Sequence, residues 1–221
     1  MSARNYTPER AEYLYMKTKT LNEKEKKTVP PQHKGEETGA AEQVEAADKE
    51  TAVSIYNRAR QRLMRVNRWG AVGGAAGFRL TDSKGKPVSG FPRNGNLIRI
   101  DLPGPGPKKG KGYDWVKIEK IRDEKSKTRD EEFFSIRVRA IAPPGEESGP
   151  NAHFYTKDTT NSFMVRRVGN MVYASVKGRN EIINRQPAGL FDRIRNTLVG
   201  LFASKGGSHL QWKSFLKGLL D

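Results

Sequence analysis

Residues Phe134–Ala140 read FSIRVRA, in which apolar and polar side chains alternate with a period of two. Successive side chains of a β-strand point to opposite faces of a sheet, so this stretch predicts a strand with one buried face. Further strands are predicted at Ile98–Leu102, Val172–Lys177, Tyr113–Ile121, Ser162–Val168 and Gly77–Thr81, with hairpin turns at Asp82–Gly85 and Val168–Asn170. We therefore expect five or six antiparallel strands that form a curled sheet or a small barrel.

Helical patterns lie on both sides of these strands. From Lys49 to Trp69, apolar residues recur at helical spacing and arginines occupy the other side. Near the C-terminus, one amphipathic helix is predicted to begin near Pro187, and a second follows Gly206-Gly207. Because a curled sheet with one apolar face needs a cover, we expect the two C-terminal helices to pack on it.

The N-terminal part of the chain has a different composition. Residues Thr20–Lys49 are rich in Glu, Lys, Ala, Gln and Pro and contain few large aliphatic side chains. Such a segment buries too little apolar surface to offset its ordering entropy. The predicted organisation is a flexible, disordered, charged tail over residues 1–48 and a single α+β domain over residues 49–221.

The composition excludes several classes of site. The 221 residues include no cysteine, which excludes a disulfide framework, a thiolate zinc site, an iron–sulfur cluster and a cysteine nucleophile. Three histidines leave little for a histidine-rich metal site, and no catalytic signature has the required spacing. We therefore predict no catalytic residue, no metal and no cofactor.

Nothing in the sequence predicts a membrane span. The longest apolar stretches without charge are about nine residues, whereas a spanning helix needs about twenty. No apolar run follows a basic start, so no secretory signal is recognised. We expect a soluble, cytoplasmic protein without integral membrane insertion, and the sequence leaves its oligomeric state open.

The charge is strongly positive and unevenly distributed. Lys and Arg number 41 and Asp and Glu 25, for a formal net charge of +16. Residues 51–100 contain ten basic side chains and one acidic side chain, Asp82. Basic stripes attract polyanions, and aromatic side chains beside them can stack on bases.

These features favour a non-enzymatic binding module for a polyanion, with nucleic acid as the leading candidate. It would use a basic helix stripe, a basic sheet face and the glycine- and lysine-rich segment 103–112. The competing interpretation is that acids on neighbouring strands neutralise these cations in pairs. The predicted contact residues are Arg58, Arg62, Arg65, Arg68, Lys108, Lys109, Lys111, Trp115, Arg137, Arg139, Lys177 and Arg179.

Two alternatives remain open. The first is a small-ligand-binding barrel or an enzyme of unknown reaction, with a pocket containing His153, Tyr155 or Glu181. The second is a docking protein whose basic face meets acidic partners or an anionic membrane surface. Convergence of the cations on one open surface would favour the polyanion hypothesis, and their pairing with neighbouring carboxylates would contradict it.

Overall fold

The computed structural model describes residues 22–73, 76–101, 113–126, 130–145, 158–181 and 207–221; in the last range, side chains are described from Trp212 onward. The elements in chain order are α2 (Glu23–Lys26), β1 (Glu36–Glu45), α3 (Lys49–Met64), the 3-10 helix η1 (Val66–Arg68), α4 (Trp69–Gly73), β2 (Gly77–Thr81), β3 (Leu97–Asp101), β4 (Asp114–Lys125), β5 (Glu131–Ile141), β6 (Thr160–Val168), β7 (Met171–Glu181) and α6 (Gly207–Leu220).

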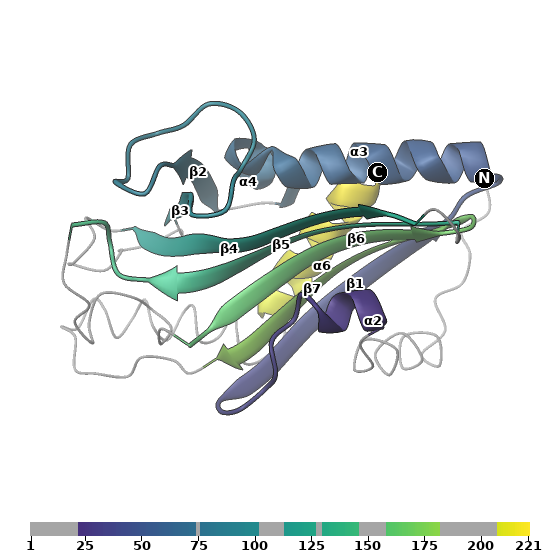
Figure 1. The fold of residues 1–221 in the computed structure, drawn as a ribbon. Helices are drawn as coiled ribbons and strands as arrows, with labels where there is room; N and C mark the ends of the chain where they lie inside the picture. Colours follow the sequence, from purple (N-terminus) through teal and green to yellow (C-terminus); the bar gives the residue numbers. More distant parts are fainter. Residues whose placement is uncertain (1–21, 74–75, 102–112, 127–129, 146–157, 182–206) are drawn as a thin grey trace.

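The strands form one curled, open antiparallel sheet with the order β1-β7-β6-β5-β4-β3-β2 (Figure 1). Helices α3 and α6 cover one face, here called the inner face, and α2 lies against the opposite, outer face. The predicted α+β class and antiparallel sheet are confirmed. The described sheet has seven strands where five or six were expected, because the prediction missed β1.

The core lies between the inner face of the sheet and the two helices. Inward-facing residues of the strands, such as Ile136 and Val165, are fully buried together with Leu63 of α3 and Leu216 of α6. Trp69 is the central aromatic of this core. Its ring centroid lies 5.0 Å from that of Phe163 and 5.5 Å from those of Phe78 and Phe215, and its indole N–H donates to the Leu63 carbonyl.

The predicted helix over Lys49–Trp69 is divided in the structure. Asp48 caps its N-terminus by accepting a hydrogen bond from the Thr51 N–H at 2.7 Å. The regular helix ends at Met64, and Arg65 leaves the helical conformation, with φ −90° and ψ 63°. The chain then continues through η1 into α4, a change of direction that the continuous apolar pattern does not reveal.

The assignment of residues 1–48 to a flexible tail is corrected for the described part of that segment. Residues 36–45 form β1, which pairs along its length with β7. Just before it, Thr28 and Val29 are buried on the outer face, where Val29 packs with Phe133 and Met164. Backbone hydrogen bonds to β7 stabilise β1 although it has few large aliphatic side chains. The composition of this segment therefore did not predict its order.

At the other end of the chain, α6 is the second of the two predicted C-terminal helices. It packs against β1, β7, α3 and α4 and supplies Phe215, Leu216 and Leu219 to the core. The first predicted helix, from about Pro187, lies outside the described residues. No helix in the described ranges is both long enough and apolar enough to cross a bilayer.

Candidate ligand site

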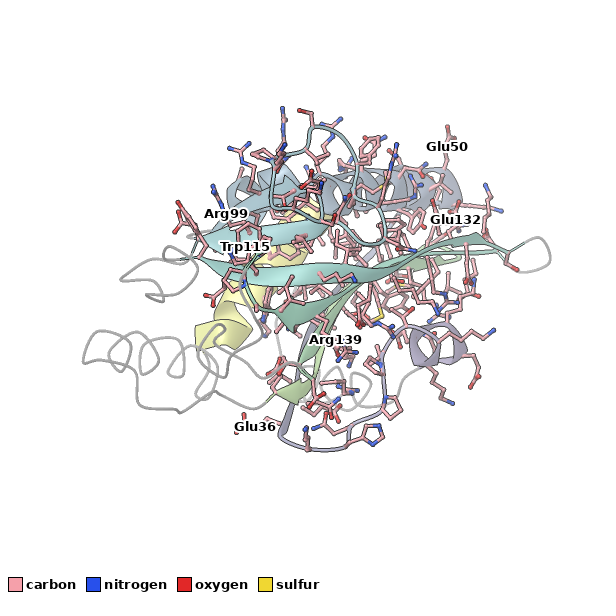
Figure 2. The ribbon with its side chains drawn as sticks, turned by 60° about the vertical axis from the view of Figure 1, so that its left-hand side comes forward. Glu36, Glu50, Arg99, Trp115, Glu132 and Arg139 are labelled. Carbon is pink, nitrogen blue, oxygen red and sulfur yellow. The ribbon has the colours of Figure 1, made fainter. Side chains whose placement is uncertain are left out.

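The arginines predicted on the sheet face lie on the outer face, but they are paired. Glu119 of β4 forms an ion pair with Arg137, at 3.0 Å between Nε and the carboxylate, and a second with Arg139. Figure 2 shows Arg139 on the side of the sheet away from α3. Glu119 lies at an irregularity in the β4–β5 register, where Ile118 faces Val138 and Lys120 faces Arg137. This bulge directs one carboxylate toward both arginines.

Lys177 and Arg179 of β7 are buried, each with 4% of its surface exposed. Arg179 pairs with Glu37 at 2.9 Å and donates to the Gly178 carbonyl. Burial lowers the pKa of Lys177 to about 8. These two cations therefore lie covered on the outer face and form no open binding surface.

A segment that precedes β1 covers this part of the outer face. Asn180 holds it: its side-chain oxygen accepts from the His33 N–H at 2.8 Å and the Lys34 N–H at 3.2 Å. Its own N–H donates to the Gln32 side chain at 2.9 Å. Asn180 adopts a positive φ of 56°, a conformation that asparagine tolerates better than most residues.

Glu181 is the described member of the predicted pocket; His153 and Tyr155 lie outside the described residues. Its carboxyl group folds over Gly178, where an added Cβ would lie 2.0 Å from Oε1. Burial raises the pKa of Glu181 to about 7, partly opposed by its hydrogen bond with Thr38. This carboxyl group is thus a buried acid that titrates near neutral pH.

The helix arginines divide into two groups. Arg62 donates to the carbonyls of Gly218 and Leu219, at 2.9 and 3.3 Å, and so caps the end of α6. Arg60, which the sequence analysis did not select, pairs with Asp123 and lies 5.2 Å over the Phe134 ring. Arg58, Arg65 and Arg68 are exposed, and no carboxylate of the described residues forms an ion pair with them.

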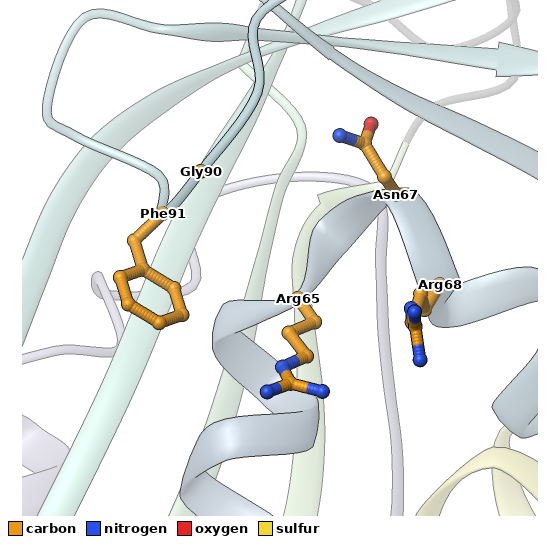
Figure 3. Close-up of a pocket in the computed structure, with 5 residues that line it drawn as sticks. All are labelled: Arg65, Asn67, Arg68, Gly90 and Phe91. Carbon is orange, nitrogen blue, oxygen red and sulfur yellow. The ribbon is translucent and has the colours of Figure 1, made fainter.

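An open cavity lies where α3 ends. It has a volume of about 370 Å³ and is lined by Arg65, Asn67, Arg68, Gly90 and Phe91 (Figure 3). The side chains of Phe91, Arg65 and Arg68 extend to the same side, whereas Asn67 points the other way. Phe91 is 56% exposed, an unusual state for a large apolar side chain. The cavity thus combines two guanidinium groups with an exposed aromatic ring.

Hydrogen bonds hold the loop that carries Phe91. The Asn67 side chain accepts from the Leu80 N–H at 2.7 Å and donates to the Val88 carbonyl at 3.2 Å, linking η1, β2 and the loop. Beyond Phe91, the Gly95 N–H donates to the Ile118 carbonyl at 2.8 Å. The loop is therefore attached to the fold on both sides of Phe91.

The sequence analysis found Arg65 and Arg68 by their charge, but it missed Phe91 and Asn67. A usable signal was the lone aromatic in the segment SGFPRNG, Ser89–Gly95, where turn residues surround it. The arginines that face Phe91 are set by how the loop packs against the residues after α3. A contact between such distant segments leaves no local pattern in the sequence.

The prediction of a nucleic-acid-binding module is wrong, because the selected cations of the sheet are paired or buried and do not join the helix arginines in one open surface. Arg137 and Arg139 share Glu119, and Lys177 and Arg179 are buried. Trp115 is only 9% exposed and cannot offer its ring to a base. Lys108, Lys109 and Lys111 lie outside the described residues.

Comparison with known proteins gives distant likenesses. No protein-family model matches the sequence. No curated protein matches it either. Among solved structures, truncated norcoclaurine synthase from Thalictrum flavum has 8% identity and a TM-score of 0.37, covering 86% of this chain and 96% of its own. The same enzyme in complex with dopamine and hydroxybenzaldehyde has 12% identity and a TM-score of 0.38, covering 83% and 84%. A START superfamily protein from Mycobacterium smegmatis has 10% identity and a TM-score of 0.29, covering 79% and 98%.

Proposed function

We propose that this protein binds a small amphipathic anion in the cavity at the end of α3. The observation that carries the proposal is the placement of Arg65 and Arg68 opposite Phe91 around about 370 Å³ of open space. Cavities of about 300 Å³ and above commonly hold small ligands. This function corresponds to the small-ligand alternative of the sequence analysis, at a different pocket.

The lining chemistry defines the class of ligand. A guanidinium group donates two parallel hydrogen bonds to a carboxylate, phosphate or sulfonate group, so Arg65 and Arg68 select an anionic head. The exposed Phe91 ring offers an apolar face to the rest of the ligand. Because Asn67 and the loop hydrogen bonds already fix the cavity wall, binding requires little ordering of the backbone.

The test uses naphthoate as the probe and naphthamide, its uncharged counterpart of similar shape, as the ligand control. Isothermal titration of the full chain should show binding of naphthoate and at least tenfold weaker binding of naphthamide, because only the carboxylate pairs with the arginines.

Three single substitutions locate the site. Phe91→Ala and Arg68→Gln should each weaken naphthoate binding about tenfold, since each removes one part of the recognition. Arg58→Gln is the matched control, because Arg58 is exposed on α3, ten residues before Arg68, but does not line the cavity. Equal affinity for acid and amide, or equal loss in Arg58→Gln and Arg68→Gln, would contradict the proposal.

A further inference from the structure

The cavity opens within a larger cationic region. Seven exposed basic residues lie in residues 51–100, and none forms an ion pair with a carboxylate of the described part of the chain. Six of them, together with Phe91, are here called the cationic face: Arg58, Arg65, Arg68, Lys84, Lys86 and Arg93; the seventh, Arg79, lies in β2 and is not counted with them. Asp82 is the one acid of this region, and its carboxylate accepts from the N–H groups of Lys84 and Lys86 at 2.9 Å.

Two structural elements bring the cationic face together. The first is the C-terminal part of α3 with the turn after it, where Arg58 is exposed on the helix and Arg65 and Arg68 are exposed just beyond its end. The other element is the loop between β2 and β3, which contains Lys84, Lys86, Phe91 and Arg93. This loop stands beside the C-terminal end of α3, as Figures 1 and 2 both show. The cavity joins the two elements, since Arg65 and Arg68 line it with Phe91.

The centre of the cationic face is apolar. Phe91 exposes 56% of its surface, whereas the next residue, Pro92, is buried. Phe91 is an exposed aromatic side chain on a loop that is hydrogen-bonded to the fold, and the same loop carries cations. Such a side chain can insert at the boundary between lipid headgroups and acyl chains. There the ring leaves water and the cations meet anionic headgroups. An acidic protein partner would need an additional recess shaped for this ring.

We propose that the cationic face docks the protein on an anionic lipid bilayer, with Phe91 entering the headgroup region. The loop cations Lys84, Lys86 and Arg93 contact headgroups outside the cavity. Arg65 and Arg68 line the cavity and extend to the same side as Phe91, so in this orientation they also face the bilayer. Docking in this orientation turns the mouth of the cavity toward the membrane.

Vesicle flotation of the full chain tests the proposal. The protein should float with vesicles of phosphatidylcholine containing phosphatidylserine, should stay unbound with phosphatidylcholine alone, and should lose binding as salt is added. Each cation near an anionic surface contributes about fivefold to partitioning, so the triple variant Lys84→Gln, Lys86→Gln, Arg93→Gln should bind about a hundredfold more weakly.

A second triple variant tests whether vesicle binding depends on the position of the cations or only on the net charge of the protein. Lys26, Lys34 and Lys125 are exposed on other parts of the molecule and pair with carboxylates, so their replacement by Gln removes the same number of charges. This control should retain most of the vesicle binding. No flotation with anionic vesicles, or equal weakening of the two triple variants, would overturn the proposal.

Two further measurements complete the test. Phe91→Ala should reduce partitioning about tenfold, and Phe91→Trp should show blue-shifted fluorescence on anionic vesicles. An unshifted emission would place residue 91 in water and contradict docking through this loop. Naphthoate affinity of the Lys84, Lys86, Arg93 variant should be unchanged, so failure of membrane docking and failure of the small-ligand function give different results.

Discussion

Replacing Glu181 by Gln should change how the stability of this protein depends on pH. Glu181 is 8% exposed, and burial raises the pKa of its carboxyl group from 4.5 to about 7. Between these values the folded protein keeps a proton that the unfolded chain releases. The free energy of unfolding therefore falls as pH rises through this window and levels off above pH 7.

The size of the effect follows from the displacement of the pKa. A change from 4.5 to about 7 corresponds to about 3 kcal/mol of unfolding free energy at high pH, most of which develops between about pH 5 and pH 8. Gln is uncharged throughout and similar in shape. The difference in unfolding free energy between Glu181→Gln and wild type should therefore grow by about 2 to 3 kcal/mol in favour of the variant across this range.

Urea unfolding at a series of pH values measures this difference, because every other titrating group cancels between the two proteins. Glu45→Gln is the control, since Glu45 lies at the other end of β1 and is exposed. Parallel stability curves for wild type and Glu181→Gln would refute the reasoning, because they would mean that the Glu181 carboxyl group titrates alike in the folded and unfolded chains.

Two further substitutions test other parts of the structure. Lys177→Met should raise the unfolding free energy at pH 7 by about 3 kcal/mol, because it removes a buried charge whose pKa is lowered from 10.5 to about 8. In urea titrations this gain should be complete below pH 8 and shrink as the pH rises toward and beyond 10.5, where the unfolded chain also loses the proton. A gain that does not depend on pH would contradict the cause. Asn67→Ala should cost about 1–3 kcal/mol and speed hydrogen exchange at the Leu80 amide, which loses its acceptor; Asn57→Ala on the exposed side of α3 is the control and should cost less than 0.5 kcal/mol.

The strands with strong alternation were predictable because one face of each is buried against the helices. Phe134–Ala140 lies within β5, where Phe134, Ile136 and Val138 are buried as the period of two requires. β1 was missed for the opposite reason. Its sequence, EETGAAEQVE, has almost no large apolar side chain, and it joins the sheet as an edge strand paired with β7.

The number of charged side chains could be read from the sequence, but the ion pairs that they form could not be predicted. Arg137 and Arg139 have the spacing of an open basic face, and Glu119 occurs about twenty residues earlier on another predicted strand. Only the bulge between Ile118 and Lys120 brings its carboxylate to both arginines. A bulge adds one residue to one strand and so breaks the alternation from which a register is predicted.

The same reasoning explains why the residues of the proposed small-ligand site were predicted only in part. Whether a cation is available to a ligand depends on whether the fold offers it a closer anion or carbonyl. Arg62 meets the last carbonyls of α6, whereas Arg65, beyond the end of the regular helix, faces the loop that carries Phe91. The two arginines are alike in sequence pattern and three residues apart. Their difference arises from the break at Arg65, which separates a capping arginine inside the fold from a cavity-lining arginine outside it.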